Sequence, residues 1–516
     1  MSETIRSYSS GGAGVYGAPG SRGRTFRRVM LVMLAAGAVW IFWTTRDTWP
    51  AEALVPGEQT YRIQAARLLA SRQDAAGSPL WRLGVLPERY HAVPELLGNN
   101  FGLPDWVLNN LVSGTCYISG KDTLAFSDVL VVTRMSRIGC LIERYHRYFG
   151  GPEVDYAGGL ELRRMPESGV YYAVRGRTLV FSPARDALIA ALTLPLDESL
   201  ARREDRDGSA AGDLHGTVAP RESDPLGAYI ERADFALAFA PGMVRFYAEA
   251  RMRAAWRAPL DAIGSGGSSG PLSAPSNGGV VVAGDLGAPL PAVWRAVDEM
   301  AGGWLSGTTA TWPGFAPGEG EAGERFREAL QEAMGPGFTL RWTGVDVDGV
   351  LPLPELDVWL ETRADAAAWL EAIPAIGPDA TPLADAPYRN PDRGVVHWPQ
   401  GWGSVFEPAL APVPGGVRLA LHAAHLEQIP AAGPPVAVSS DLYIRIRPSE
   451  ALALIQEAGM VYAECGLIRG HSLASFQTTM DGLMAGTREV SEVRIAAGYR
   501  DGAVRLEAEI ELRPGG

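Results

Sequence analysis

The chain has 516 residues, of which 47% are hydrophobic and 20% are charged, so it can build roughly two to four domains with sizeable cores. It carries 46 Lys and Arg against 59 Asp and Glu, a formal net charge of -13 at pH 7. Because nucleic-acid binding requires cationic side chains that displace counterions from phosphates, this acidic balance argues against nucleic acid as a partner.

The first predicted element is a transmembrane helix over residues 29–45. The segment contains no charged side chain, and its length is at the lower limit for a helix that spans a bilayer. Four arginines lie between residues 22 and 28, whereas Arg46 and Asp47 cancel each other after the segment. The positive-inside rule then keeps the N-terminus in the cytoplasm. We expect a single-pass protein of the bacterial inner (cytoplasmic) membrane, with residues 1–28 as a disordered cytoplasmic tail and the bulk of the chain outside.

A cleaved signal peptide is the alternative interpretation of the same segment. Ala51-Glu52-Ala53 has the small-x-small form of a cleavage site. The Trp-rich end of the segment and the long leader before it favour the uncleaved anchor. A mature N-terminus at Leu54 would decide for the signal peptide.

Residues 54–263 form the first predicted lobe, which mixes short strands and helices. Pro183 opens one of the helices, because proline in a first turn costs no backbone hydrogen bond. We expect strands at 115–119, 124–133, 160–164, 170–174, 178–181 and 235–239, and helices at 138–149, 184–192 and 243–263.

The second half of the chain begins after a Gly/Ser-rich linker or loop over residues 264–279. Residues 280–305 are expected to complete the first lobe with a strand and a helix, and residues 306–323 form an irregular loop. Residues 324–513 form the second lobe. Its expected strands are 339–345, 357–362, 417–422, 441–446, 490–497 and 504–512, and its helices are 364–373 and 449–459.

The second lobe is predicted to be an internal repeat of the first. Six residues recur without a gap, namely Gly169, Val170, Gly176, Val180, Phe181 and Pro183 as Gly394, Val395, Gly401, Val405, Phe406 and Pro408. Asp128 likewise recurs as Asp357, and Asp234 as Asp441. The recurring residues are turn glycines, apolar strand residues and a helix-opening proline, which specify a shape rather than a reaction.

The expected fold class is α+β, with one N-terminal transmembrane helix followed by two related lobes of mainly antiparallel sheet covered by helices. Strands joined by turns as short as Arg175-Gly176-Arg177 must pair antiparallel. A parallel nucleotide-binding sheet is therefore not expected.

Two short motifs resemble a hydrolase site and a dinucleotide-binding site, but the residues around them do not fit either function. Residues 470–474 resemble the nucleophile elbow of α/β-hydrolases, but no histidine follows His471, so Ser472 is expected to cap a helix beginning at Leu473. The glycines between residues 318 and 323 have the spacing of a dinucleotide fingerprint. Prolines interrupt the strand that should precede them, and glutamates lie where a pyrophosphate would bind.

Metal ligands are sparse. Glu143 and His146 share a helix face, yet a di-iron site needs this motif twice. His422 and His425 with Glu427 offer ligands on one face, but the HExxH order is absent and a catalytic zinc usually takes three fixed ligands. The sequence therefore predicts neither a metal site nor a cofactor, and metal binding at the histidine pair is the lesser alternative.

The three cysteines, Cys116, Cys140 and Cys465, are too few and too scattered for a disulfide scaffold. Cys116 and Cys140 are interpreted as small buried apolar residues, with a disulfide between them as the alternative.

An aromatic group is the best candidate for a ligand surface, because stacked rings beside polar groups suit sugars or lipid chains. It consists of Tyr388, Trp398, Trp402 and Phe406. Packing in a core or a loop is the competing interpretation. If the rings bind a ligand, Trp402→Ala should abolish binding without lowering the melting temperature.

The run from Gly169 to Leu192 and the closing strands 490–512 resemble bacterial exported proteins of the domain-of-unknown-function type, which have one N-terminal anchor followed by repeated α+β units. The resemblance implies no catalytic residue. We expect a non-catalytic, membrane-anchored envelope protein that acts as a binding or scaffolding module for an envelope protein or a hydrophobic or glycan ligand. The alternative is an envelope hydrolase of glycan or lipid whose site is assembled from residues distant in sequence.

Overall fold

The fold comes from a computed structural model that describes most, but not all, of the chain. The described residues are 21–46, 49–66, 69, 72, 75–78, 103–121, 128–149, 152–165, 169–202, 213–222, 227–240, 242–263, 278–288, 293, 333–346, 352–363, 388–390, 394–397, 409–428, 441–468, 470 and 472–513.

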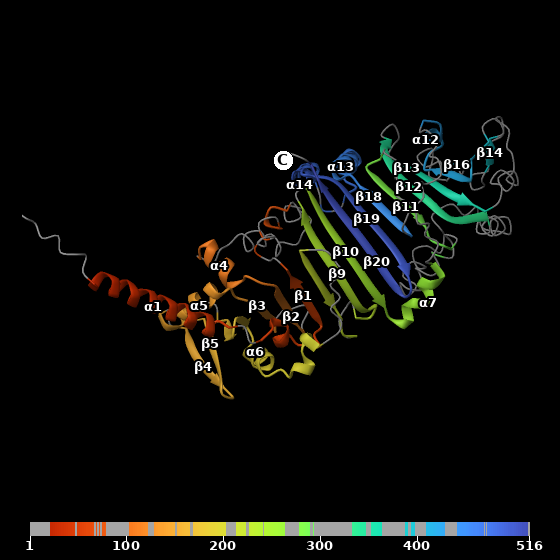
Figure 1. Ribbon diagram of the computed structural model, residues 1–516. Coiled ribbons are helices and arrows are strands. Elements are labelled where there is room, and N and C mark those ends of the chain that lie inside the picture. The colour runs from red at the N-terminus through yellow and green to blue at the C-terminus, as the bar shows by residue number, and fades with distance from the viewer. Residues whose placement is uncertain are drawn as a thin grey trace, which may run out of the picture.

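Helix α1 (Ser21–Thr44) covers all but the last residue of the predicted transmembrane segment and begins before it, at Ser21. Its most apolar window, Phe26–Trp43, has 18 residues and a mean hydropathy of 1.6, and none of it is buried inside the protein. By length and composition, α1 is able to cross a membrane, as an anchor or as a signal sequence. Figure 1 shows it projecting from one end of the molecule.

The first half of the chain alternates strands and helices before a long hairpin. In chain order it contains η1 (Ala51–Leu54), β1 (Tyr61–Ala65), α4 (Asp105–Leu111), β2 (Cys116–Gly120), β3 (Leu130–Arg134), α5 (Arg137–Phe149), β4 (Glu153–Ala157), β5 (Leu160–Arg164), β6 (Tyr171–Arg175), β7 (Thr178–Ser182), α6 (Arg185–Leu192), η4 (Leu196–Glu198), η5 (Leu200–Arg202), β8 (Leu214–Val218), β9 (Ile230–Ala240), β10 (Met243–Met252) and α7 (Ala254–Ile263).

The second half is richer in strands. It contains β11 (Val280–Asp285), β12 (Met334–Asp346), β13 (Leu353–Thr362), β14 (Tyr388–Asn390), β15 (Val395–His397), β16 (Ala409–Val413), β17 (Gly416–Ala420), α12 (Ala423–Gln428), β18 (Leu442–Ile446), α13 (Pro448–Glu464), α14 (Leu473–Thr487), β19 (Val490–Arg500) and β20 (Ala503–Leu512).

All described strands belong to one antiparallel sheet. Its middle is the row of long strands seen side by side in Figure 1. From one edge to the other, the pairings give the order β4, β5, β6, β7, β3, β2, β1, β8, β9, β10, β20, β19, β18, β11, β12, β13, β17, β16, β15, β14.

The predicted fold class, an α+β fold of two lobes covered by helices, is wrong. The sheet is continuous, and the C-terminal hairpin β19–β20 lies in its middle, between β10 and β18. β11 pairs with β12 and β18 and with no strand of the first half. Because an alternating strand can pair with any open edge of matching register, sequence order does not reveal this arrangement. The antiparallel pairing itself is as predicted.

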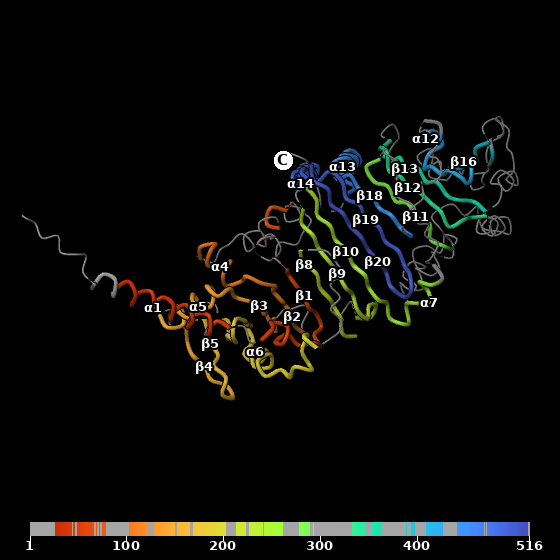
Figure 2. Tube along the Cα trace, viewed as in Figure 1, coloured from red at the N-terminus to blue at the C-terminus, as the bar shows by residue number. Residues whose placement is uncertain are grey.

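The helices lie mainly at the ends of the central strands rather than over them. Figure 2 traces α13 and α14 at one end and α7 at the other. α13 packs against β12 and β19, α7 against β19, and α12 against β13, β16 and β17. Among the described helices, none is therefore seen to cover the middle of the central sheet.

The helix expected over residues 243–263 is also corrected. Met243–Met252 is strand β10, and only Ala254–Ile263 is helical. Val244, Phe246 and Ala248 alternate with polar residues, which is the period of a strand. Pairing with β9 on one side and β20 on the other satisfies the backbone of β10. Helix propensity over this stretch is therefore overridden by the sheet.

The main core of the first half lies where β2, β3, β5, β6, β7 and α6 meet. Leu54 and Val55 insert into it together with Leu188 on α6. Hydrophobic burial on this scale holds η1, and with it the chain that follows α1, against the body.

The predicted repeat can be compared at few described positions, and these do not agree with one another. Gly169 and Gly394 both have a positive φ (68° and 65°) shortly before a strand, whereas Asp128 and Asp357 differ. Asp128 lies in a turn and accepts a hydrogen bond from the Lys121 amide at 2.8 Å. Its predicted counterpart Asp357 is 1% exposed in the middle of β13. Phe181 is in β7, but Phe406 lies outside the described residues. The domain boundaries of the repeat stay a prediction.

Candidate functional site

The aromatic group predicted as a ligand surface falls mostly outside the described residues. Tyr388 is the first residue of β14 and is paired across the sheet with His397. Trp398, Trp402 and Phe406 lie outside the described part of the chain. The structure therefore neither brings these four rings together nor separates them, and the surface stays a prediction.

The structure assigns local roles to three of the other motifs. Ser472 caps α14, and its hydroxyl and that of Ser475 form a reciprocal capping box with the backbone. Glu143 is buried and binds Arg147 one turn later, with Arg147 Nη2 donating to Glu143 Oε2 at 2.7 Å. His425 is 2% exposed, with Nε2 at 3.2 Å from Asp346 Oδ2. These contacts hold helix ends and turns in place.

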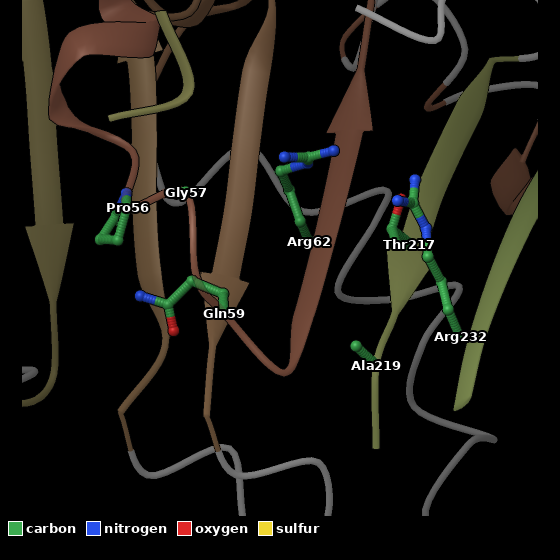
Figure 3. Close-up of a pocket in the computed structure, with 7 residues that line it drawn as sticks. All are labelled: Pro56, Gly57, Gln59, Arg62, Thr217, Ala219 and Arg232. Atoms are coloured by element: carbon green, nitrogen blue, oxygen red, sulfur yellow. The ribbon is translucent and has the colours of Figure 1, made fainter. Parts of the chain in front are cut away.

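A small polar cavity opens where β1, β8 and β9 run side by side (Figure 3). Its volume is about 90 Å³, room for a few water molecules and much less than the roughly 300–1,000 Å³ of a typical ligand pocket. Arg62, Thr217 and Arg232 line it from the strands, and Gln59 from the segment before β1. Its lining contains no His, Asp or Glu that would suit acid–base catalysis.

The charges around the cavity are largely compensated. Arg232 Nη2 and the Thr217 hydroxyl both donate to Asp234 Oδ1, at 3.0 and 2.7 Å. Two residues before Thr217 on β8, burial and then the charge of Arg62 lower the pKa of His215, which favours its neutral form. The cavity can hold water or a small polar group.

The broadest feature of the central sheet is a face made almost entirely of apolar side chains, here called the apolar face. Side chains opposite each other in antiparallel strands point to the same side, so the register defines its rows. The middle row is Leu237, Phe246, Ala508, Ile495, Ile444, Val282, Leu340 and Val358. The flanking rows are Phe235, Ala248, Leu506, Ala497 and Leu442, and Phe239, Val244, Ile510, Val493, Ile446 and Val280.

Most side chains of the apolar face are only partly buried. Phe246, in the middle row, is 36% exposed, whereas Val244 is buried. Ile444, Ile495 and Leu506 are half-buried. Contiguous apolar surface of this kind is rare on monomeric soluble proteins and usually marks an interaction site.

The opposite face of the same strands is a ladder of ion pairs. Arg494 at its centre contacts Glu492, Glu509 and Glu511 at 2.5, 3.5 and 3.0 Å. Arg245 continues the ladder through Glu509 at 3.0 Å. Exposed pairs such as these add little stability, but they make this face compatible with water. The central sheet thus has one face suited to solvent and one suited to an apolar partner.

Farther along the sheet, the polar side is closed by a helix. Asp357 is 1% exposed and binds the guanidinium groups of both Arg341 and Arg418. Arg418 Nη1 also donates to the Leu426 carbonyl of α12 at 3.4 Å. The buried carboxylate of Asp357 is thus neutralised by two buried guanidinium groups, and we assign the cluster a structural role.

The apolar face was missed by the sequence analysis, although its signal is present in the chain. Residues 244–250 and 504–510 alternate apolar and polar side chains with period two. The alternation predicts strands with one apolar face each. Only the tertiary pairing reveals that these faces join across strands from both halves of the chain.

Comparisons with known proteins add no family. No protein-family description matches the chain, and no curated protein matches it. Among solved structures, the chain is similar to crystal forms III and I of TP0453, at 8% and 6% identity and a TM-score of 0.23 in each case. These similarities cover 40% of this chain and 82% and 80% of the other. At this TM-score they carry no argument about fold or function.

Proposed function

We propose that the protein is a non-catalytic, single-pass scaffold of the bacterial envelope that assembles through the apolar face of its central sheet. Its N-terminus lies in the cytoplasm, α1 spans the inner membrane, and the sheet lies outside. In this proposal the protein is related to membrane-anchored exported proteins of the domain-of-unknown-function type. It is supported by the apolar window of α1 and by the four arginines in the first two turns of that helix.

The apolar face is the observation that carries the scaffolding role. Its three rows cross strands β9, β10, β20, β19, β18 and β11, and the middle row continues onto β12 and β13. A sheet buries an apolar face against another layer of secondary structure. The described helices that contact these strands lie near the strand ends (Figure 1), so the middle row is the part of the face that a partner would cover.

The size of the apolar face fits a second copy of this chain. Its nineteen side chains, spaced about 4.8 Å from strand to strand and about 6.8 Å along each strand, give a face on the order of 600 Å². A standard stable interface buries roughly 800 Å² on each partner, and homodimer interfaces are the more apolar class. A single acyl chain would cover a small part of this area. Confinement to a membrane by α1 further favours self-association by raising the local concentration.

The cavity beside β1 does not offer a site for the hydrolase alternative. Its lining has no carboxylate, histidine or nucleophile pair, and its volume is too small for a glycan or lipid substrate. No described feature favours hydrolysis over scaffolding.

The oligomeric state of the full chain tests this proposal. We expect the wild-type protein to have the mass of a dimer by light scattering in mild detergent. Phe246→Glu should convert it to a monomer, because the substitution puts a charge in the middle row of the apolar face at a position that is already 36% exposed. The fold of the variant is checked by its circular dichroism spectrum and thermal transition.

The matched control is Arg245→Glu, on the neighbouring residue and the opposite face. Its side chain is 60% exposed in the ion-pair ladder, so the variant should remain a dimer. A monomeric wild type, or a Phe246→Glu variant that is still a dimer, would refute assembly through this face. Stoichiometric lipid bound to a wild-type monomer would identify lipid as the occupant and refute the second copy.

A further inference from the structure

Helix α5 buries the opposite side from the one its sequence would suggest. Its apolar stripe is exposed, with Ile138 at 54%, Tyr145 at 68%, Tyr148 at 77% and Phe149 at 76% exposure. These residues recur at the three- and four-residue spacing of one helix face. The side packed against the body holds Gly139, Cys140 and the Glu143–Arg147 pair. A helix that points its large apolar residues away from the core is expected to meet a second apolar medium.

Strand β4, which follows α5 in the chain, exposes two more large apolar side chains. Val154 and Tyr156 are 46% and 71% exposed and lie on the same side of the strand. We call the residues Ile138, Tyr145, Tyr148, Phe149, Val154 and Tyr156 the aromatic patch. Half of its members are tyrosines, which combine an apolar ring with a polar hydroxyl and are enriched where one end of a side chain is apolar and the other is wet.

Helix α5, which carries most of the patch, lies beside the C-terminal end of α1. The guanidinium carbon of Arg137 is 4.3 Å from the centre of the Phe42 ring, and that of Arg144 is 5.7 Å from the Trp40 ring. Both arginines are on α5, which Figure 1 also draws next to the end of α1. The last turn of α1 is where tryptophans would mark the membrane interface.

Few residues separate α1 from the main core, and described residues on either side of the gap at 47–48 pack against the protein. Thr45 is 1% exposed, and its hydroxyl donates to the Ile41 carbonyl at 2.6 Å. The guanidinium carbon of Arg175 lies 3.7 Å from the Trp49 ring. Ala51 and Leu54 already belong to the main core. The body therefore sits directly against the end of the helix.

Helix α5 is basic, whereas the chain as a whole is acidic, so α5 is better suited to an anionic lipid surface. The helix carries Arg137, Arg144 and Arg147 against one glutamate, Glu143, which is paired and buried. The whole chain has a net charge of -13. A basic segment on an acidic protein is attracted to anionic headgroups while the remainder is repelled.

We propose that the aromatic patch lies in the headgroup region of the same membrane that α1 crosses, so that α5 and β4 set the body on the bilayer surface. The tyrosine and phenylalanine rings insert at the depth of the glycerol groups, and Arg137 and Arg144 face lipid phosphates. The proposal rests on the membrane-anchoring part of the proposed function and is independent of assembly through the apolar face.

The test places a fluorescent label in the patch of the full chain reconstituted into liposomes. Tyr156→Cys in a Cys465→Ser background leaves one exposed thiol, because Cys116 and Cys140 are buried. A nitrobenzoxadiazole label at residue 156 should emit at shorter wavelength and be quenched by lipids that carry a nitroxide near the headgroup. Liposomes of phosphatidylglycerol and phosphatidylcholine should give stronger quenching than phosphatidylcholine alone.

The matched control is the same label on native Cys465, which is exposed beyond α13 and should not be quenched. Adding Tyr148→Ser and Phe149→Ser to the Tyr156→Cys protein should remove most of the quenching. Both residues are more than three-quarters exposed, so the fold should be unaffected. Equal quenching at residues 156 and 465, or none at either, would overturn the proposal.

A blue-shifted label at residue 156 without lipid quenching would also overturn the proposal, because protein would then cover the patch.

The Phe246→Glu variant separates this proposal from the proposed scaffold. The monomer that this substitution is expected to produce should keep full quenching at residue 156. Light scattering therefore tests assembly through the apolar face, and quenching at residue 156 separately tests contact with the membrane.

Discussion

At the scale of single residues, burial decides how the three cysteines behave. Burial raises the pKa of Cys116 to about 12, and burial also raises the pKa of Cys140. Both thiols are free, and Cys465 is exposed. This arrangement agrees with the interpretation of Cys116 and Cys140 as small buried apolar residues.

We predict that iodoacetamide at pH 8 modifies one cysteine of the folded protein, Cys465. The thiolate is the reactive form, and a thiol with a pKa of about 12 has on the order of one part in ten thousand as thiolate at pH 8. Mass spectrometry of tryptic peptides measures the modification. In denaturant without reductant all three should react, whereas reaction of Cys465 alone would reveal a disulfide between Cys116 and Cys140.

Some residue roles could be predicted because they depend only on neighbours in sequence. Ser472 was expected to cap a helix that begins at Leu473, and it does so with Ser475. The hairpin closed by Asp501 and Gly502, both with positive φ (53° and 78°), was likewise expected at residues 490–512. The Asp357 cluster was not predictable, since Arg341 and Arg418 reach it from two other strands.

At the scale of elements, β10 shows how pairing overrides a local pattern. The turn before it requires Gly242, whose φ is +81°, so that β9 can fold back onto β10. The prediction of a helix over residues 243–263 did not take the turn at Gly242 into account. An apolar residue at every second position, together with a glycine turn, was the signal for a hairpin.

We predict opposite effects for two Gly→Ala substitutions that both have open space around the added Cβ. Gly242→Ala should destabilise the protein by about 1 kcal/mol, because a left-handed backbone is unfavourable for alanine. Gly482→Ala, inside α14, should stabilise it by about 0.5–1 kcal/mol. Urea unfolding followed by circular dichroism measures both. If Met243–Met252 were helical, the Gly242 substitution would have little effect.

At the scale of the whole molecule, the sheet ties the two ends of the chain together. β10 from the first half pairs along its length with β20 at the C-terminus. Arg505 on β20 contacts Glu249 on β10 at 3.0 Å, and the Tyr499 hydroxyl is 3.4 Å from the Arg257 carbonyl of α7. The two lobes expected from the sequence would have made few such contacts.

We predict that cutting the chain between α7 and β11 does not separate its halves. A protease site inserted there should yield two fragments that co-elute on size exclusion in native buffer, because β10 and β20 stay paired. Separation requires denaturant. Fragments that elute apart in native buffer would support two independent lobes and contradict the continuous sheet.

The sequence alone determined what depends on local chemistry: an apolar N-terminal helix preceded by arginines, most strand positions, antiparallel pairing through short turns, and the cap at Ser472. Tertiary structure decided the rest. The place of β19 and β20 between β10 and β18, the joining of their apolar sides into one face, and the outward stripe of α5 all follow from contacts between distant segments. Alternation and periodicity specify which side of an element is apolar, but only the assembled fold decides whether that side meets the core, a partner or a membrane.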